Sequence, residues 1–318
     1  MNLVILDGHA LNPGDLSWQP LAQLGALTYY DRTEPEQVLA RAADADVLFT
    51  NKVVLDARVL AALPRLKYIG LLSTGYNVVD VQAAHAAGIP VCNVPAYSTD
   101  SVAQLTFALL LEAANGVGEH AGSVARGDWA AHPDFCYWLR PLSELSGKSI
   151  GIVGFGSIGR AVARIATAFG MRVYASGRRA FDAPQDVVAC DTETLLRSCD
   201  VISLHCPLTP DNAGMIDADA VSKMRDGAIL INTARGGLID ERAVLQGLER
   251  GKLSWYLADV LTQEPPATDT PLLRHPRCIV TPHIAWASRA ARERLLDIAA
   301  DNLRTWQNGG LIHCVWQK

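Results

Sequence analysis

The sequence predicts an α/β protein with two domains, each a parallel β-sheet covered by helices. Short apolar runs alternate with helix-type patterns along almost the whole chain, which is typical of βα units. The runs are continuously apolar, as expected for strands that are buried on both faces of a parallel sheet. A chain of 318 residues is also longer than one ordinary hydrophobic core requires, so two domains are expected.

Composition and charge argue against several classes of protein. With 49% hydrophobic and 19% charged residues, the chain has the composition of a globular protein with large buried layers. Its net charge is −5 with acids and bases interspersed, so there is no basic stripe for nucleic acid. No apolar run approaches the ~20 residues that span a bilayer. The run at residues 3–6 lacks the basic lead-in of a signal peptide.

The seven cysteines are scattered, at positions 92, 136, 190, 199, 206, 278 and 314. They form no CxxC motif and no Cys/His cluster with the spacing of a zinc site. Free thiols in a reducing cytoplasm and no bound metal are therefore expected.

The first third of the chain reads as a βα series. Strands are expected at residues 3–6, 27–30, 47–50, 68–72 and 91–94, with helices at 34–43 and 79–87. A long helix is expected at 100–122, with Ser98 or Thr99 as its cap. Its apolar positions nearly encircle it, which suits a helix that packs between domains or subunits. The aromatic-rich segment 127–145 is expected to be an ordered loop.

A second βα series is expected to begin at Lys148. Its strands are expected at residues 149–153, 172–175, 187–189, 201–205, 228–232, 255–260 and 279–281. The last helix, at 288–307, is expected to stop at the run Asn308-Gly309-Gly310, since such a run terminates helices well.

A glycine-rich turn follows the first strand of this second series. Residues 154–159 read GFGSIG, with the spacing G-x-G-x-x-G, and open a helix expected at 158–169. Glycines at these positions allow a tight turn and let backbone N–H groups approach a pyrophosphate at the start of the helix. The pattern therefore predicts a Rossmann-like dinucleotide-binding domain.

The next strand ends without the acid that holds the ribose hydroxyls of NAD. Its end reads Ser176-Gly177-Arg178-Arg179, with Gly177 at the position of the acid. A carboxylate there would repel a 2′-phosphate, whereas a hydroxyl and two guanidiniums would bind one through charge-assisted hydrogen bonds. The sequence therefore predicts NADP(H) as the preferred cofactor, with NAD(H) as the alternative.

Three residues that suit proton and hydride chemistry follow strands of the second series. They are Arg235, Glu264 and His283, and ligands of open parallel sheets bind beyond the carboxyl ends of strands. An arginine can hold a carboxylate and polarise a carbonyl. A histidine can donate a proton near neutral pH, and a glutamate on its other ring nitrogen fixes the tautomer. Together they predict reduction of a small 2-keto acid.

These motifs resemble the D-isomer specific 2-hydroxyacid dehydrogenase family. The likeness rests on GFGSIG, NTARGG, DVLTQEPP and TPHIAW, and it covers nearly the whole chain. Within the family the chain looks most similar to the glycerate dehydrogenase, hydroxypyruvate reductase and glyoxylate reductase group. The segments LDGHALNPGDLSW, STGYNVVD and PDFCYW add to that likeness.

The resemblance implies roles for single residues. It makes Arg235 the substrate-binding arginine, Glu264 the glutamate partner, His283 the acid/base, and Asp259 the acid that holds the nicotinamide amide. The residues expected to bind the cofactor are Gly154, Phe155, Gly156, Ser157, Ile158, Ser176, Arg178, Arg179, His205, Cys206, Pro207, Thr233, Ala234, Asp259, His283 and Ala285. Those expected to bind the substrate are Lys52, Ser73, Thr74, Gly75, Tyr76, Arg235 and Trp286.

Some of these assignments have plain alternatives. Backbone amides of the loop at 73–76 are expected to hold the substrate carboxylate, as successive N–H groups can. Lys52 ends a strand on the same side, and ordinary solvent exposure is its alternative role. Trp286 is expected to wall the substrate pocket, and a place in the core is its alternative.

The resemblance also implies the domain organisation. A discontinuous, flavodoxin-like substrate domain of residues 1–99 and 287–318 would surround a Rossmann domain of residues 100–286. The active site would be the cleft between them, and its closure would exclude water from the hydride path. The helix at 100–122 and the aromatic loop after it suggest a homodimer.

The expected function is hydride transfer between NADP(H) and a small D-2-hydroxy or 2-keto acid, with hydroxypyruvate or glyoxylate as the keto acid. One alternative is an NAD-linked D-lactate-type or other 2-keto acid reductase. An alternative from another class is a nucleotide-sensing, corepressor-like binding protein. The intact set of Arg235, Glu264 and His283 favours an enzyme.

Overall fold

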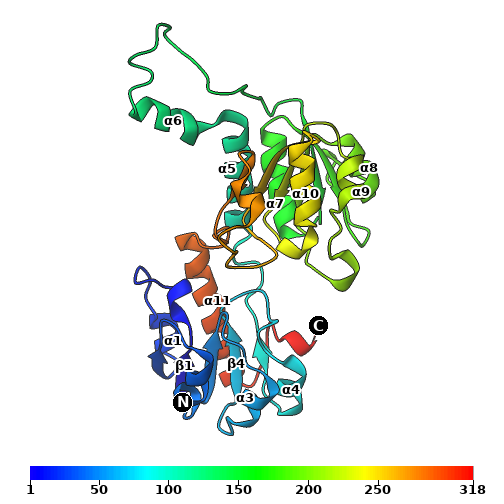
Figure 1. The fold of residues 1–318 in the computed structure, drawn as a ribbon. Helices are drawn as coiled ribbons and strands as arrows, with labels where there is room; N and C mark the ends of the chain where they lie inside the picture. The colour runs from blue at the N-terminus through cyan, green and yellow to red at the C-terminus, as the bar shows by residue number, and fades with distance from the viewer. Residues whose placement is uncertain (318) are drawn as a thin grey trace. The chain divides into compact units, whose positions relative to one another are not determined.

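The computed structural model describes residues 1–317, and the chain divides into two compact units (Figure 1). Unit 1 comprises Met1–Ser98 together with the segment from Trp286 onward, and unit 2 comprises Thr99–Ala285. Each unit has its own parallel sheet, so each is described separately.

The sheet of unit 1 is parallel throughout. Its strands are β1 (Asn2–Ile5), β2 (Ala26–Tyr29), β3 (Val47–Thr50), β4 (Tyr68–Leu71) and β5 (Val91–Cys92). They lie in the order β2-β1-β3-β4-β5, which is the order of flavodoxin-like doubly wound sheets. In β1, Leu3 and Ile5 point into one core while Val4 points into the other, since side chains alternate along a strand. Both faces of the sheet are therefore buried.

Helices cover both faces of this sheet. The helices are α1 (Gln19–Ala22), α2 (Val38–Ala42), α3 (Ala57–Ala61), α4 (Val81–Ala86) and α11 (Arg289–Gln307), with short 3₁₀ turns at Gly8–Ala10, Pro35–Gln37 and Val315–Gln317. Residues of α1 and α11 pack with Leu3 and Ile5, while residues of α2, α3 and α4 pack with Val4. Ser288 caps α11, because its hydroxyl accepts a hydrogen bond from the Ala291 N–H.

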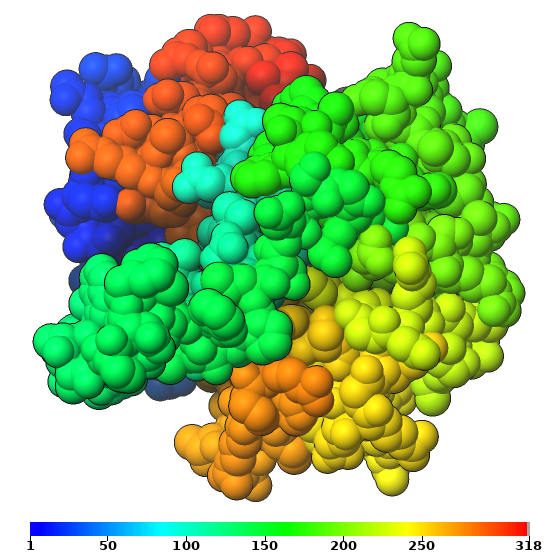
Figure 2. All heavy atoms as spheres, turned by 90° about the horizontal axis from the view of Figure 1, so that it is seen from above, coloured from blue at the N-terminus to red at the C-terminus, as the bar shows by residue number. Residues whose placement is uncertain are grey.

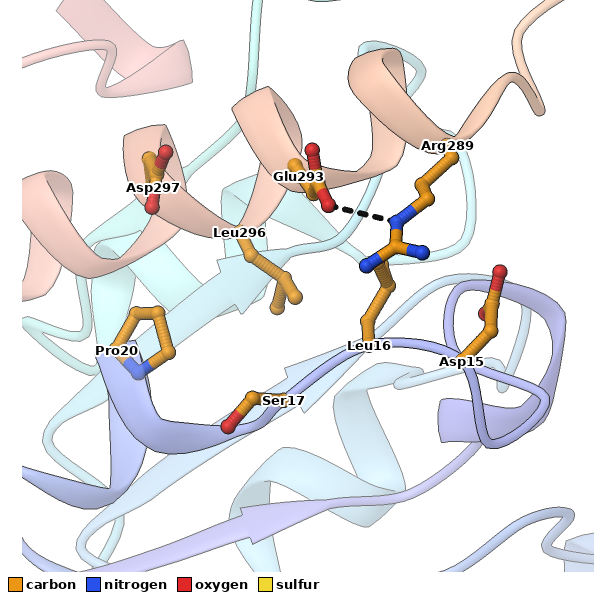
Figure 3. A pocket seen from close by; sticks show the side chains of 8 residues that line it. All are labelled: Asp15, Leu16, Ser17, Pro20, Arg289, Glu293, Leu296 and Asp297. Atoms are coloured by element: carbon orange, nitrogen blue, oxygen red, sulfur yellow. Dashed lines mark hydrogen bonds and ion pairs between the residues drawn. The ribbon is translucent and has the colours of Figure 1, made fainter.

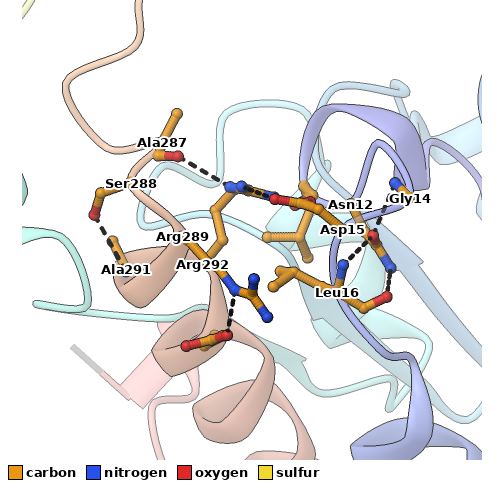
Figure 4. A network of polar contacts seen from close by, with 11 residues as sticks. Asn12, Gly14, Asp15, Leu16, Ala287, Ser288, Arg289, Ala291 and Arg292 are labelled. Carbon is orange, nitrogen blue, oxygen red and sulfur yellow. Dashed lines mark hydrogen bonds and ion pairs between the residues drawn. The ribbon is translucent and has the colours of Figure 1, made fainter.

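Arg292 in the first turn of α11 ties the helix to the N-terminal loop (Figure 4). Its guanidinium donates to both carboxylate oxygens of Asp15, at 2.7 and 2.6 Å, and to the carbonyls of Leu11 and Ala287, both at 2.9 Å. Only 10% of the Arg292 side chain is exposed. The hydrogen bonds from Arg292 also hold the pKa of Asp15 below its usual value.

Replacement of Arg292 by methionine should lower the free energy of unfolding by about 2 kcal/mol, because the hydrogen bonds of this mostly buried guanidinium to Asp15 and to the Leu11 and Ala287 carbonyls would be lost. Urea unfolding followed by circular dichroism would measure this. Arg289→Met is the matched control, since Arg289 is 68% exposed and, within residues 1–317, its side chain bonds only to Glu293. Equal urea midpoints for the two variants would contradict the expectation.

The sheet of unit 2 is also parallel. Its strands are β6 (Ser149–Val153), β7 (Arg172–Ser176), β8 (Val187–Ala189), β9 (Val201–Leu204), β10 (Ala228–Asn232), β11 (Leu253–Ala258) and β12 (Cys278–Val280). They lie in the order β12-β11-β10-β9-β6-β7-β8. This is the order of a Rossmann sheet with one added strand, and the direction of winding reverses between β6 and β9. Ligands bind at that reversal in open α/β sheets.

Helices also cover both faces of the second sheet. The covering helices are α5 (Thr99–Asn115), α7 (Ser157–Ala168), α8 (Thr192–Ser198), α9 (Ala218–Lys223) and α10 (Glu241–Glu249), with 3₁₀ turns at Pro210–Asn212, Gly236–Leu238 and Pro271–Arg274, while α6 (Val117–Ala125) belongs to neither core. Residues of α5 and α7 form one core with the sheet, and residues of α8, α9 and α10 form the other. The predicted fold class of two doubly wound parallel-sheet domains is therefore confirmed.

The expectation of one long helix at 100–122 was wrong. The helix stops at Asn115, and α6 begins at Val117. Between them Gly116 has φ +57°, a left-handed conformation that ends a helix and that glycine adopts easily. The Arg140 guanidinium also donates to the last carbonyls of α5, at 2.6 Å to Glu112 and 2.6 Å to Ala113. A long-range contact therefore satisfies the end of α5.

The aromatic-rich segment after α6 contains neither helix nor strand. It extends with α6 away from the sheet of unit 2 (Figure 1), and the two form a separate green lobe in the space-filling view (Figure 2). Several of its large apolar side chains are exposed, among them Phe135 at 88% and Trp138 at 66%.

Each expected strand of both units is present within about two residues of its expected bounds. Among the helices of residues 1–317, none has the length and apolar character needed to span a bilayer.

Candidate active site

The three predicted catalytic residues follow three neighbouring strands. Arg235 follows β10, Glu264 follows β11 and His283 follows β12, and these strands pair side by side in parallel. Their carboxyl ends therefore meet at one edge of the sheet. The glycine turn after β6 and His205 after β9 lie along that same edge.

His283 and Glu264 form a close pair. The Nδ1 atom of His283 lies 2.6 Å from Oε2 of Glu264, and about a third of each side chain is exposed. The other oxygen of Glu264 accepts a hydrogen bond from the Leu261 N–H at 2.9 Å, which fixes the carboxylate. An acceptor at Nδ1 places the proton of the neutral ring there. The Nε2 atom, which has no protein partner among residues 1–317, is then available for proton exchange.

Asp259 holds the loop that carries His283. Its carboxylate accepts hydrogen bonds from the Thr281 hydroxyl (2.6 Å) and from the N–H groups of Ile284 (2.8 Å) and Ala285 (2.7 Å). Burial raises the pKa of Asp259, although these hydrogen bonds oppose that shift. His283 has φ +54°, an uncommon backbone conformation for a non-glycine residue. The bonds to Asp259 hold the backbone on both sides of it.

Arg235 projects from a turn that Asn232 shapes. The Asn232 side chain donates to the Arg235 carbonyl at 2.9 Å and accepts from the Ala234 N–H at 3.1 Å. The Arg235 side chain is exposed, and it donates to the Ala234 carbonyl at 2.7 Å. Most of its five N–H donors are therefore free for an anion.

The glycine turn has the form of a phosphate cradle. Gly154 has φ +99°, and a Cβ there would lie 2.6 Å from the Cys206 nitrogen. Gly156 caps α7, and a Cβ built on it meets nothing within 4 Å. The first glycine is thus required by close packing against the turn after β9. The second leaves open space at a helix N-terminus, where a pyrophosphate would bind.

Two alanine substitutions should separate these roles. Gly154→Ala is expected to lower the free energy of unfolding by about 2–4 kcal/mol, because the methyl group would collide with backbone in a strained conformation. Gly156→Ala should leave stability nearly unchanged and weaken nucleotide binding, because its methyl group fills the cradle. Thermal unfolding and a nucleotide titration would test both. Equal effects of the two variants on stability would refute this division.

His205 and Cys206 line the turn that packs against Gly154. The His205 Nε2 atom lies 2.8 Å from the Ser203 hydroxyl. Burial lowers the pKa of His205 to about 4, so the ring is neutral at physiological pH. Its Nδ1 atom is buried and has no hydrogen-bond partner among the described residues. A buried polar atom without a partner is uncommon, and it agrees with a polar ligand at this edge.

The end of β7 differs in one respect from expectation. The Ser176 side chain, expected to contact a 2′-phosphate, is only 2% exposed. Its hydroxyl accepts a hydrogen bond from the Thr192 hydroxyl at 3.2 Å, because β7 continues through Ser176 and turns the side chain inward. Arg178 and Arg179 are exposed and have no hydrogen bond or ion pair within the described chain. They are the groups at this strand end that can meet an anion.

Unit 1 contributes a loop with unbonded amides. In the segment 73–76, the Ser73 hydroxyl donates to the Gly75 carbonyl and the Thr74 hydroxyl to the Val94 carbonyl, both at 2.7 Å. The backbone N–H groups of Thr74, Gly75 and Tyr76 have no acceptor among residues 1–317. Successive unbonded N–H groups can bind a carboxylate.

Asp7, which was not among the residues expected from the sequence, fixes a loop at the carboxyl edge of the sheet of unit 1. Its carboxylate accepts hydrogen bonds from the N–H groups of Asn51, Lys52 and Val53, at 2.8, 2.5 and 3.2 Å. Burial raises the pKa of Asp7. These bonds fix the loop that carries Lys52, whose side chain is exposed. The signal in the sequence was an acid two residues beyond β1, at the carboxyl edge of the first sheet.

Trp286 belongs to unit 1 and packs in its core. Its ring meets that of Tyr97 edge-on, with centroids 6.4 Å apart, and it packs against the core beneath α11.

Three other residues that are expected to bind the cofactor differ in their exposure. Thr233 is buried, and its hydroxyl lies 3.1 Å from that of Thr106. Pro207 is exposed, and Ala234 is half-buried beside Arg235.

One cavity lies apart from the predicted site residues (Figure 3). It has a volume of about 350 Å³ in unit 1, between the N-terminal loop and α11. Its lining residues are Asp15, Leu16, Ser17, Pro20, Arg289, Glu293, Leu296 and Asp297. Across residues 1–317, no group of His, Cys, Asp or Glu side chains is arranged to hold a metal ion.

Comparison with known proteins agrees with this geometry. The family model described as D-isomer specific 2-hydroxyacid dehydrogenase, NAD binding domain, matches residues 107–285. A hydroxypyruvate reductase of Blautia hydrogenotrophica is 44% identical over 322 residues, covering 99% of each chain. A glycerate dehydrogenase of Methylorubrum extorquens is 42% identical over 284 residues, covering 88% of each.

Solved structures share the whole architecture. The TT0316 protein of Thermus thermophilus superposes with a TM-score of 0.85 at 36% identity, covering 98% of each chain. An acyclic imino acid reductase in complex with NADPH and D-Arg superposes with a TM-score of 0.86 at 27% identity, covering 99% of each.

A Rossmann domain with this turn and this His–Glu pair defines a nicotinamide-dependent dehydrogenase. The chain belongs to the D-isomer specific 2-hydroxyacid dehydrogenase family, and it acts as an oxidoreductase on CH–OH donors. The predicted family and enzyme class are confirmed.

Proposed function

We propose that this protein reduces a short 2-keto acid, hydroxypyruvate or glyoxylate, to the corresponding hydroxy acid (the D form where C2 becomes chiral), and that it prefers NADPH. The observation that carries the proposal is the 2.6 Å contact between His283 Nδ1 and Glu264 Oε2. It leaves Nε2 of a histidine free at the same sheet edge as the glycine turn. A dehydrogenase needs a proton donor at that edge.

The residues divide the chemistry among themselves. When bound, the reduced nicotinamide supplies hydride to C2 of the keto acid. As the C=O π bond breaks, protonated His283 gives its Nε2 proton to the oxygen, and the imidazole regains a proton from solvent. Glu264 stabilises the imidazolium through Nδ1. Arg235 holds the substrate carboxylate and draws electron density from the keto oxygen.

The two units contribute different groups. Unit 2 carries Arg235, Glu264, His283 and the nucleotide cradle, so we propose that residues 99–285 are the cofactor domain. Unit 1 carries the loop 73–76, whose unbonded N–H groups suit a carboxylate. We assign this loop to substrate binding, with Lys52 beside it as an added positive charge. Asp259 retains acceptor capacity for the nicotinamide amide, since its three hydrogen bonds occupy three of the about four lone-pair sites of a carboxylate.

The names of relatives support a two- or three-carbon keto acid. Relatives that cover 85% or more of this chain include a hydroxypyruvate reductase, a glycerate dehydrogenase and a glyoxylate reductase. Hydroxypyruvate and glyoxylate share a carboxylate next to a carbonyl, which is the pair of groups that Arg235 and His283 address.

The test is a panel of 2-keto acids assayed with both nucleotides. Hydroxypyruvate and glyoxylate should give higher kcat/KM than pyruvate or branched 2-keto acids. A preference for pyruvate with NADH would instead favour a D-lactate-type reductase. Nucleotide binding without turnover of any keto acid would favour a corepressor-like binding protein.

Arg178 and Arg179 are proposed to bind the 2′-phosphate of NADP(H). Arg178→Ala/Arg179→Ala should raise the Kd for NADPH by about 10²-fold, because each charged hydrogen bond contributes about 1.5–3 kcal/mol before solvent screening. The Kd for NADH should change little. Arg172→Ala is the matched control, since that exposed arginine opens the same strand at its opposite end. Equal losses of NADPH and NADH affinity would contradict the assignment.

We propose that the protein forms a homodimer and that its interface includes the exposed lobe of α6 and residues 127–145. Several large apolar side chains are exposed on this lobe, and exposed apolar surface is typical of association sites. Val117 and Val124 of α6 are 61% and 45% exposed, and they accompany Phe135 and Trp138.

A further inference from the structure

The connector between β7 and β8 is fixed against the nucleotide-binding helix. The Arg160 guanidinium of α7 donates to the Asp182 carbonyl at 3.1 Å. Further along the helix, the Thr167 hydroxyl donates to the Asp186 carboxylate at 2.9 Å. The connector begins at Gly177 and ends before Val187, so these two contacts fix its middle and its end against α7.

A tilted aromatic contact joins this connector to the glycine turn. The Phe181 ring of the connector lies 4.8 Å from the Phe155 ring of the turn, measured between centroids, with 38° between the planes. The Arg160 guanidinium lies 4.7 Å from the centroid of the same Phe155 ring. Phe155 is 6% exposed, and Phe181 packs on the core beside it. Phe155 therefore contacts both Arg160 and Phe181.

The Phe181 ring crowds the position that a side chain at Gly177 would occupy. A Cβ at this position would lie 3.1 and 3.2 Å from two carbons of the Phe181 ring, and 3.3 Å from the Arg179 carbonyl oxygen. Such distances are shorter than ordinary contacts between carbons. The φ of Gly177 is not in the left-handed region, so its backbone alone does not require glycine. The Phe181 ring is what restricts the position.

Gly177 stands where an acid would hold the ribose hydroxyls of NAD. We infer that Phe181, held against Phe155 and Arg160, is a specificity-determining residue for the nicotinamide nucleotide, because its ring occupies the space that a carboxylate at position 177 would need. This inference rests on the proposed NADP preference. Phe181 thereby keeps the strand end free of negative charge, and the connector presents Arg178 and Arg179 to the adenosine 2′-phosphate.

The contact between position 177 and the Phe181 ring restricts how this protein could acquire a preference for NAD. An acidic residue at position 177 would have to shift the Phe181 ring, because its Cβ alone would lie 3.1 Å from a ring carbon. Acquisition of an acid there should therefore depend on loss of the ring. Positions 177 and 181 are coupled in this view, and a double-mutant cycle measures such coupling directly.

The experiment compares the wild-type protein with Gly177→Asp, Phe181→Ala and the double variant. The Kd values for NADPH, NADH, 2′,5′-ADP and 5′-AMP are measured by calorimetry. Gly177→Asp alone should weaken all four nucleotides, because the displaced ring distorts the turn. Phe181→Ala should weaken NADPH and 2′,5′-ADP by about tenfold through loss of the aromatic contact, with NADH little changed.

The double variant should bind NADH at least tenfold more tightly than Gly177→Asp does, and more tightly than it binds NADPH. If Gly177→Asp alone gains NADH affinity as fully as the double variant, the effects are additive and the inference is overturned. If Gly177→Asp does not fold, Gly177→Ala tests the same contact. Its lost NADH affinity should be restored by Phe181→Ala, and no restoration would overturn the inference.

Phe169→Ala is the matched control. Phe169 ends α7 and stacks on Phe107 with centroids 5.4 Å apart, so it removes an aromatic pair away from the turn. It should not change the ratio of NADPH to NADH affinity. A wild-type preference for NADH would refute the proposed NADP preference, while the NADH values would still measure the coupling of positions 177 and 181. Turnover of 2-keto acids is a separate measurement, so failure of the enzyme proposal would show there.

Discussion

Replacement of His283 by alanine is expected to lower kcat by about 10²–10⁴-fold, the usual contribution of a positioned general acid. The reason is geometric. Glu264 holds Nδ1 at 2.6 Å, and the three bonds to Asp259 hold the surrounding loop, so His283 is fixed in place to supply the proton. Steady-state kinetics with a 2-keto acid and NADPH would measure the loss.

Two further variants separate chemistry from folding. The Kd for NADPH should stay within a few-fold of the wild type in His283→Ala, because the cradle is formed elsewhere. Added imidazole should restore part of the turnover. His275→Ala is the matched control, since His275 precedes β12 as His283 follows it. Unchanged turnover in His283→Ala would contradict the proposed mechanism.

The kcat of Glu264→Gln should lie between that of the wild type and that of His283→Ala. An amide can still accept at Nδ1, but it cannot stabilise the imidazolium by charge. The loss of kcat should therefore be smaller than in His283→Ala and should appear with little change in KM.

Replacement of Arg235 by alanine is the second large effect. The kcat/KM for a 2-keto acid should fall by about 10³-fold, which corresponds to about 4 kcal/mol of lost transition-state stabilisation. KM should rise and kcat should fall, because the guanidinium is proposed to bind the carboxylate and to polarise the carbonyl. Initial-rate kinetics over a range of keto-acid concentrations would separate the two effects.

Arg235→Lys tests the geometry of the charge. A lysine restores the charge without the planar fork of donors, so it should recover only part of the lost activity. Arg242→Ala is the control, since Arg242 is an exposed arginine shortly after Arg235 in the chain. Full activity of Arg235→Ala would show that another cation holds the substrate.

Patterns within the sequence predicted most of the architecture. Mainly apolar runs of three to six residues located the strands, since burial on both faces of a parallel sheet favours apolar side chains at most positions within them. GFGSIG predicted the nucleotide turn because its glycines are needed for local reasons: one has φ +99°, and one leaves room for a ligand. The proposed catalytic set was predictable since each residue follows a strand, and all carboxyl ends of a parallel sheet share one edge.

Contacts between distant segments could not be read from such patterns. The helix break at Gly116 is stabilised by Arg140, which lies 24 positions further along the chain. The role of Asp259 depends on the backbone of Ile284 and Ala285, 25 and 26 positions away. The Ser176 hydroxyl was expected at the surface, and a hydrogen bond from Thr192 accompanies its burial.

The sequence by itself determined the two parallel-sheet domains, the nucleotide turn and the three residues at the strand ends. These follow from periodicity and from residue chemistry, which are local properties of a chain. Only the tertiary structure decided that Glu264 bonds to Nδ1 of His283, that Asp259 fixes the loop around that histidine, and that Phe181 fills the space beside Gly177. Each of these depends on atomic distances between segments, and such distances are set only when the chain packs.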